Sequence, residues 1–419
     1  MKNTKVAFLP LVLLVLSACG GGNGGNSGSQ GNSGFRLNDP IDTSMLTANC
    51  KAYIDVMREQ EKSLDDPYKY SALEGDGFVS VEDYLDTGEV EGQNRTVNGQ
   101  IPNRSDRSEG VKLLFAVDAD VEAEQYKVLV SDNEDFENAK ELVTSTNEVT
   151  VDNLFVNTEY YWKVMTDDAE SEVKTFTTGD YPRWITARPM YNVRDNGGYM
   201  TSSGKRVKQG LVYRGGEITT MTSSGHYNTI AESSKEVFRN EMKIKVELDL
   251  RGASDIGDGY NANAFAENGD IEYKQYAIKS YEQTFTQTRS MVAPIFEILK
   301  EADEKPVYYH CFGGADRTGT LGFLLNGVLG VSYTDLLIDF ELTSYSSINN
   351  EHIRNHMNGH QHQYDRWPAL INQLKTDTTG GYAWSDSKSL QDNINDFLVK
   401  ACSVPQETIN TIRSIMLED

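Results

Sequence analysis

The chain has 419 residues, enough for two or three domains, and its 38% of hydrophobic residues can fill sizeable cores. Its 63 acidic and 39 basic residues give a formal net charge of −24. This charge argues against binding to nucleic acid, or to anionic lipid by charge alone. A site for an anion would need its own local positive field, and the candidates to supply it are Arg194, Arg214, Arg251, Arg317 and Lys279.

The N-terminus carries the pattern of an export signal. Lys2 and Lys5 precede an apolar run over residues 6–16, which is too short to span a bilayer and is typical of a signal peptide. Small residues then precede Cys19, and this ending resembles a bacterial lipobox. The resemblance implies a signal peptide over residues 1–18 and an exported, membrane-anchored protein that begins with a diacylated Cys19. Ordinary secretion with cleavage nearby is the alternative.

The next two segments connect this signal to the folded parts. Residues 19–34 are almost entirely Gly, Asn and Ser, a composition that predicts a flexible linker. Residues 35–107 are less informative and are left without an assigned role. A helix is expected over 48–64, and the acidic, polar stretch 74–107 is expected to be loop.

Residues 108–180 have the character of an all-β domain. Short strands at a spacing of roughly 8–12 residues indicate a β-sandwich. The predicted strands are 111–117, 125–130, 148–151, 160–165 and 173–177. The stretch from Leu154 to Trp162 resembles the fibronectin type III pattern, in which a corner tyrosine bonds back to the chain. The resemblance implies a spacer or a contact surface for a protein partner, with Tyr126 and Trp162 in its core.

Strands alternate with helical patterns over residues 181–419, which predicts an α/β domain. Residues 243–250 and 271–278 are expected to be strands, and 286–302 a helix that leads to a strand over 307–309. Two amphipathic helices are expected at the C-terminal end, over 387–401 and 405–417.

The run HCFGGADRTG at residues 310–319 carries the chemistry. It lies between a predicted strand and a strongly apolar helix, so its backbone N–H groups and the helix N-terminus can form an anion nest. Gly313 and Gly314 permit the required backbone angles, and the Arg317 guanidinium can grip two oxyanion atoms. The same positive field would lower the pKa of Cys311, and Thr318 could donate to its sulfur. A thiolate beside a bound phosphate implies attack on phosphorus and a covalent cysteinyl-phosphate.

This run resembles the phosphate loop of the protein tyrosine phosphatase superfamily, and its DRTG ending resembles the bacterial tyrosine/lipid phosphatase branch. Three more segments match that branch in order: 192–199, 211–216 and 249–252. A bare Cys-x5-Arg also occurs in sulfurtransferases and arsenate reductases, whereas four ordered segments are specific. The resemblance covers 181–419 and implies a mixed, mostly parallel sheet flanked by helices. It also implies chemistry that needs no metal or other cofactor.

The resemblance implies roles for individual residues. Cys311 would be the nucleophile and Arg317 the phosphate clamp. The phosphate-binding residues would be Phe312, Gly313, Gly314, Ala315, Asp316 and Arg317. His310 and Thr318 would support the loop and its thiolate. Asn192, Arg194 and Asp195 would brace the loop, while Arg214 and Arg251 would contact either the substrate or internal carboxylates.

The general acid that protonates the leaving group is left open between three carboxylates. Asp316 lies inside the loop, as in the branch that the sequence resembles. Glu282 stands where other members of the superfamily carry an aspartate on a mobile loop. Asp249 ends a predicted strand, although it could instead form a salt bridge that shapes the loop. We favour Asp316.

The substrate class also remains open. A phosphotyrosyl protein is the first hypothesis, and inositol phosphates or phosphoinositides are the second. The bacterial branch often has a lysine directly before its Asp-Arg-Thr, and this chain has Ala315 there, which weakens the second hypothesis. An inactive, phosphoanion-binding surface protein is the third, although an intact nucleophile argues against it.

Two clusters have several interpretations. His352, His356 and His360 would share a helix face if the segment were helical, and His362 follows them. They could line an ordinary surface, a lid that contacts anions, or a metal site, which would need a further ligand and supporting groups. Cys50 and Cys402 could form a disulfide in an oxidising compartment or remain separate thiols.

Overall fold

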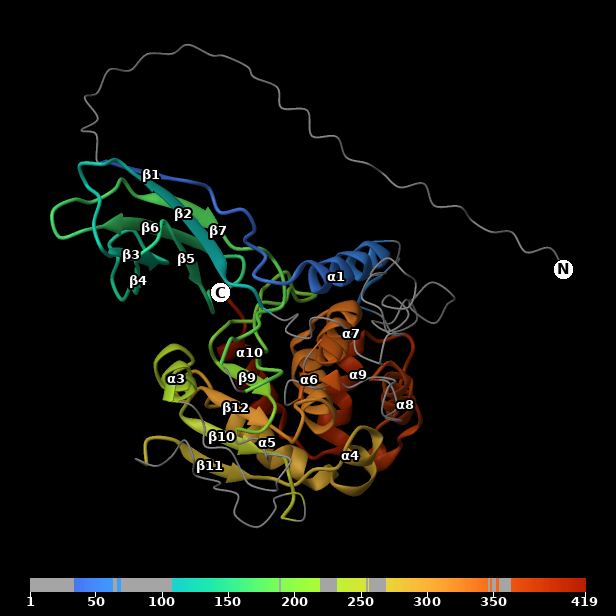
Figure 1. Ribbon diagram of the computed structural model, residues 1–419. Coiled ribbons are helices and arrows are strands. Elements are labelled where there is room, and N and C mark those ends of the chain that lie inside the picture. The colour runs from blue at the N-terminus through green and yellow to red at the C-terminus, as the bar shows by residue number, and fades with distance from the viewer. Residues whose placement is uncertain are drawn as a thin grey trace, which may run out of the picture.

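The computed structural model describes residues 34–62, 66–68, 108–187, 190–218, 232–253, 255, 269–345, 347–348, 352–353 and 363–419 (Figure 1). The predicted signal peptide, Cys19 and the acidic stretch 74–107 lie outside these residues, as does the linker up to residue 33. Among the helices of the described part, none is long and apolar enough to cross a membrane.

Two antiparallel sheets share one core in the N-terminal half. The first has the order β1-β2-β5, with β1 at Phe35–Leu37, β2 at Val111–Val117 and β5 at Glu148–Val151. The second has the order β4-β3-β6-β7, with β4 at Lys140–Thr144, β3 at Tyr126–Ser131, β6 at Glu159–Met165 and β7 at Lys174–Thr177. β2 alternates buried and more exposed residues as a half-buried strand should.

The interior of this region contains the residues expected there. Trp162 and Tyr126 are buried in a hydrophobic cluster to which both sheets contribute. The backbone N–H of Phe155 donates a 2.9 Å hydrogen bond to the Tyr160 hydroxyl oxygen. The strands agree with the predicted ones apart from β1 and β4, which were not predicted. The assignment to the fibronectin type III class stays a prediction.

The segment 35–61 is divided between the two halves of the molecule. β1 pairs with β2, whereas α1 (Ala48–Glu61) packs beside α7 (Tyr333–Glu341). Tyr53, Ile54 and Met57 of α1 are completely buried in the large core of the C-terminal half.

A five-stranded sheet organises the C-terminal half, in the order β11-β10-β12-β9-β8. Its strands are β8 (Arg194–Asp195), β9 (Val212–Gly215), β10 (Val246–Asp249), β11 (Glu272–Gln275) and β12 (Val307–His310). β9, β12, β10 and β11 are mutually parallel and β8 is antiparallel to β9, so the predicted mixed, mostly parallel sheet is confirmed. Every residue of β9, β10 and β12 is buried, as expected for parallel strands covered on both faces.

Helices pack around this sheet, and Figure 1 shows α6, α7, α8 and α9 grouped beside it. They are α3 (Glu232–Glu236), α4 (Glu282–Gln287), α5 (Val292–Leu299), α6 (Asp316–Leu329), α8 (Gln363–Thr376), α9 (Leu390–Asp396) and α10 (Gln406–Met416). The continuous helix predicted over 286–302 is wrong, because a 3₁₀ turn at Arg289–Met291 separates α4 from α5. α7 was not predicted.

The structure also bears on the two ambiguous clusters. Cys50 and Cys402 are both buried and are not joined by a disulfide, so they are separate thiols. His352 lies in a short strand, β14 (His352–Ile353), that pairs with β13 (Ser347–Ile348), which contradicts a helix through that position. The other three histidines of the cluster lie outside the described residues. Among the residues that are described, no three His, Cys, Asp or Glu side chains form a group that could hold a metal.

Candidate active site

The loop after β12 lies where several parallel strands end. β9 ends at Gly215, β10 at Asp249 and β12 at His310, and these three residues are register partners across the sheet. Ligands of open α/β sheets bind beyond the carboxyl ends of the strands. Residues 311–315 form the loop there, and α6 begins at Asp316.

The loop has the backbone of an anion-binding turn. Gly314 has a φ of +66°, and a Cβ atom at this position would lie 2.4 Å from the carbonyl carbon of Gly215. Only glycine is compatible with both conditions. Ala315 precedes α6 without any side-chain cap. The first N–H groups of the helix are therefore not capped by a side chain at that position and are suited to an anion.

Cys311 lies inside this turn and is 2% exposed. Burial by itself raises the pKa of its thiol, but the positive charge of Arg317 and the influence of Thr318 outweigh burial, so the pKa is lowered. The Thr318 hydroxyl is close enough to contribute, although its geometry falls short of a hydrogen bond. A lowered pKa favours the thiolate, which is the nucleophilic form.

Two nitrogens of the Arg317 guanidinium differ in their contacts. Its Nη1 lies 2.5 Å from Oδ2 of Asp255. Its Nε is fully buried and has no hydrogen-bond partner among the described residues. Because a buried N–H group without a partner costs free energy, this edge of the guanidinium is suited to an oxyanion of a bound ligand.

Asp255 was missed by the sequence analysis. It follows β10 in a turn, in which its N–H donates to the carbonyl oxygen of Gly252 over 2.9 Å. The charge and hydrogen bond of Arg317 outweigh the opposing effect of burial and lower the pKa of Asp255. The sequence offered no signal for this contact, because an acidic residue in a polar stretch has no distinguishing pattern.

Asn192 braces the loop from below. Its side-chain amide donates 3.0 Å hydrogen bonds to the carbonyl oxygens of both Gly313 and Gly314. Arg194 in turn donates to the amide oxygen of Asn192. The carbonyl oxygen of Phe312 accepts from the Tyr191 hydroxyl over 3.0 Å. These contacts fix three of the loop carbonyls away from the nest.

Asp339 of α7 joins two arginines beneath the loop. Arg194 donates to its carboxylate through Nε over 3.1 Å, and Arg214 donates to the other carboxylate oxygen. Arg214 also donates to the Gly314 carbonyl oxygen over 3.1 Å. All three side chains are almost completely buried, and the two arginines lower the pKa of Asp339 against the effect of its burial. Both arginines contact an internal carboxylate, which is one of the two roles left open for Arg214.

Asp195, the third predicted brace residue, has a different task. Its carboxylate forms a 2.7 Å ion pair with Arg183 and accepts hydrogen bonds from the backbone N–H groups of Gly197 and Gly210. It therefore holds the connection between β8 and β9 rather than the loop itself.

A second buried group supports the loop from the β10 side. His310 Nε2 lies 3.0 Å from Glu247 Oε1, and its Nδ1 lies 3.1 Å from the carbonyl oxygen of Cys311. Burial lowers the pKa of His310, but Asp249 and Glu247 raise it by more. A positively charged imidazole beside the nucleophile would favour its thiolate.

Asp249 lies in the same group and does not have the properties of a general acid. Arg251 contacts both of its carboxylate oxygens at 2.8 and 2.9 Å, and the Tyr273 hydroxyl donates over 3.0 Å. Burial raises the pKa of Asp249, but His310 and Arg251 outweigh it, so the pKa is lowered and the group stays ionised. Arg251 also forms a 2.6 Å ion pair with Glu217. Asp249 and Arg251 are therefore internal supports.

Two carboxylates remain as candidate acids. Asp316 is half-buried at the first position of α6, where it accepts a hydrogen bond from the Tyr281 hydroxyl. Glu282 is the first residue of α4, and its Oε2 is buried without a partner among the described residues. Lys279, on the same connection, is exposed.

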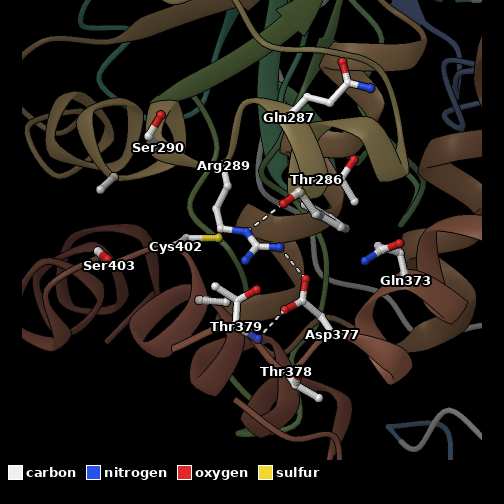
Figure 2. A pocket seen from close by; sticks show the side chains of 13 residues that line it. Thr286, Gln287, Arg289, Ser290, Gln373, Asp377, Thr378, Thr379, Cys402 and Ser403 are labelled. Atoms are coloured by element: carbon white, nitrogen blue, oxygen red, sulfur yellow. Dashed lines mark hydrogen bonds and ion pairs between the residues drawn. The ribbon is translucent and has the colours of Figure 1, made fainter. Parts of the chain in front are cut away.

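A separate cavity of about 700 Å³ lies between the end of α4, the start of α5 and the C-terminal end of α8 (Figure 2). Figure 2 shows Arg289 pointing at Asp377, with which it forms an ion pair, and Cys402 close by. Burial raises the pKa of Cys402 to about 12, which makes it unreactive at neutral pH. None of the lining residues belongs to the loop at 310–319, and the paired charges leave no obvious ligand.

One family model matches the part of the chain that contains both the loop and the buried residues that support it. The family model described as "Tyrosine phosphatase family" matches residues 185–418, which include the sheet, the loop and both buried groups. The chain belongs to the tyrosine phosphatase family.

Other comparisons of this tyrosine phosphatase-family chain are weaker. Among solved structures it is similar to the core catalytic domain of a PP-IP phosphatase from S. cerevisiae in complex with citrate, at 16% identity and a TM-score of 0.24. The similarity covers 35% of this chain and 73% of the other, and is too low to bear on the substrate. No curated protein matched the chain.

Replacing Asp339 should destabilise the phosphatase domain strongly. In Asp339→Ala, the buried Arg194 and Arg214 lose their carboxylate, and breaking a buried ion pair in this way costs about 3–5 kcal/mol. Urea unfolding followed by fluorescence would measure the loss. Glu301→Ala, which removes an exposed ion pair with Lys305, is the control and should change stability by less than about 1 kcal/mol. Equal stability of Asp339→Ala and wild type would contradict the bracing role.

Replacing Asp255 should weaken anion binding modestly. Asp255→Asn removes the charge that holds Nη1 of Arg317, so the guanidinium loses orientation. Since the carboxylate is partly exposed, the effect on the inhibition constant of vanadate should be only about two- to fivefold, towards weaker binding. Tighter vanadate binding would instead identify Asp255 as a competitor of the ligand for Arg317.

Proposed function

We propose that this chain hydrolyses phosphate monoesters through a covalent cysteinyl-phosphate on Cys311. One observation carries the proposal: a cysteine with a lowered pKa lies beside an arginine whose buried Nε lacks a hydrogen-bond partner among the described residues. A nucleophile and a candidate anion site share one turn at the N-terminus of a helix. Membership of the tyrosine phosphatase family supports the same chemistry.

The residues suggest the order of events. The Cys311 sulfur attacks phosphorus and the bond to the leaving-group oxygen breaks, while Asp316 gives that oxygen its proton. Arg317 and the loop N–H groups stabilise the three other phosphate oxygens in the transition state. Water then attacks phosphorus, the sulfur leaves as thiolate, and Asp316 recovers a proton from that water. Phosphate is released last.

A phosphotyrosyl protein is our first choice of substrate. Phe312, beside the nucleophile, is 38% exposed and could contact an aromatic ring. Arg194 and Arg214 share the buried carboxylate of Asp339, Arg251 is paired with Asp249 and Glu217, and position 315 is an alanine. Among the described residues this leaves Arg317 and Lys279 as the cations for a substrate, which suits one phosphate better than several. Inositol phosphates or phosphoinositides are the alternative, and an inactive phosphoanion-binding protein is the second alternative.

We also propose that the enzyme acts outside the cytoplasm, anchored by lipid at Cys19. The signal pattern at residues 1–18 and the linker that follows support this location. The two-sheet region would then be a fibronectin type III-like spacer or a surface for a protein partner.

Cys311→Ser tests the proposed chemistry. With p-nitrophenyl phosphate in excess chelator, we expect the wild type to release nitrophenol and the variant to lose at least about 10³-fold in kcat, because the serine hydroxyl is not ionised. Alkylation of Cys311 by iodoacetamide should become fast at a pH below the ordinary thiol pKa of about 8.5. Phosphotyrosyl peptide and inositol hexakisphosphate, compared as substrates of the wild type, would decide between the two substrate classes.

Asp316→Asn tests the general acid. Acid catalysis typically contributes about 10²–10⁴-fold, and it matters most when the leaving group is a poor one. We expect the variant to keep the burst of nitrophenol from p-nitrophenyl phosphate but to hydrolyse an alkyl phosphate at least about 10²-fold more slowly. Glu282→Gln is the matched comparison. If that variant shows this selective loss and Asp316→Asn does not, the acid is Glu282.

A further inference from the structure

Tyr281 occupies an unusual position next to the loop. It lies in the connection between β11 and α4, immediately before Glu282. Its backbone has a φ of +51° and a ψ of −132°, a region that residues other than glycine rarely adopt. Such conformations persist only where the surrounding contacts hold them, and they concentrate at functional sites.

Several contacts of Tyr281 connect it to α6 and its surroundings. Its hydroxyl donates to Oδ1 of Asp316, and its backbone N–H donates to the Thr320 hydroxyl oxygen over 3.1 Å. The Thr320 hydroxyl donates in turn to the carbonyl oxygen of Asp316 over 2.8 Å. The Tyr281 ring packs against Phe340 of α7, with 6.1 Å between the ring centroids. The side chain of Tyr281 thus contacts Asp316, the residue that we favour as the acid, and its backbone is linked to Asp316 through Thr320.

The connection itself is tied down at its other end. The Lys279 N–H donates to the Thr288 hydroxyl oxygen over 2.9 Å, and the Thr284 hydroxyl donates to the Lys279 carbonyl oxygen over 2.5 Å. Residues 279–288 therefore form a short anchored segment. In other members of the superfamily, the corresponding segment is a mobile loop that carries the acid. In this chain, Tyr281 attaches the segment to α6.

We propose that Tyr281 is a positioning residue that holds the Asp316 carboxyl group in place for proton transfer to the leaving group. This inference rests on the proposed function and extends it by one residue. A fixed carboxyl group delivers its proton without first having to be oriented. The Tyr281 hydroxyl also donates to the carboxylate that forms when the proton has been given up, which stabilises the developing negative charge. Tyr281 itself does not touch the reacting atoms.

The test is Tyr281→Phe, which removes the hydroxyl and keeps the ring that packs on Phe340. We expect kcat for an alkyl phosphate to fall about tenfold, since part of the acid's contribution is lost, while kcat for p-nitrophenyl phosphate falls less than about threefold. The KM values and the inhibition constant of vanadate should stay within about twofold of the wild type, because the anion nest is untouched.

Tyr161→Phe is the matched control. The Tyr161 hydroxyl also donates to a carboxylate, that of Glu159 at 3.2 Å, but on β6 of the two-sheet region. The kcat values of Tyr161→Phe for both substrates should equal those of the wild type. The melting temperatures of both variants, measured alongside, show whether either substitution disturbs the fold.

A double-mutant comparison separates positioning from a general structural effect. In the Asp316→Asn background there is no acid to orient, so adding Tyr281→Phe should change the rate of alkyl phosphate hydrolysis by less than about twofold. An equal slowing of both substrates by Tyr281→Phe, or a further tenfold loss in the double variant, would overturn the inference. So would a loss confined to vanadate binding. Activity that survives in Cys311→Ser would overturn the proposed function instead, so the two failures can be told apart.

Discussion

The buried carboxylate of Asp339, shared by Arg194 and Arg214, is the interaction on which the candidate site depends. It joins α7 to β8 and β9, and both arginines pass the connection on, one through Asn192 and one directly, to the carbonyl oxygens of the loop. A turn that points its N–H groups inward must turn its carbonyl oxygens outward, where they need donors. Arg214 and Asn192 are such donors, Arg194 holds Asn192, and Asp339 makes it possible for two guanidinium groups to be buried side by side.

The same arrangement explains how an acidic protein can hold an anion. The three buried arginines are balanced, taken together, by three buried carboxylates, those of Asp339, Asp249 and Glu217. The local positive field comes instead from the helix N-terminus, the loop N–H groups and Arg317. Such a field is screened over a short distance, so it acts mainly on a phosphate group bound in the loop.

The sequence was sufficient for the parts of the site that are contiguous. The loop at 310–319 has a motif because its chemistry constrains neighbouring positions, and the mixed, mostly parallel sheet was implied by the family resemblance that this motif carries. Asp339 could not be found in this way, since 145 positions separate it from Arg194 and α7 lies in a stretch with no predicted helix. Asp255 and Tyr281 are similar cases, because their importance comes from one contact in space. The break between α4 and α5 was missed since a 3₁₀ turn preserves most of the helical periodicity.

The burial of α1 shows that the hydrophobic core of the C-terminal half extends beyond the residues that match the family. The family match begins at residue 185, but the core beneath α7 is completed by Tyr53, Ile54 and Met57, and Arg58 forms a 3.0 Å ion pair with Asp335 of α7. A fragment trimmed to the match would expose the apolar surface that these side chains cover, at a cost of about 1.5–3 kcal/mol for each large side chain. The segment that carries α1 is therefore built into the interior of the C-terminal half, and a cut after α1 would separate the part that matches the family from side chains that complete its core.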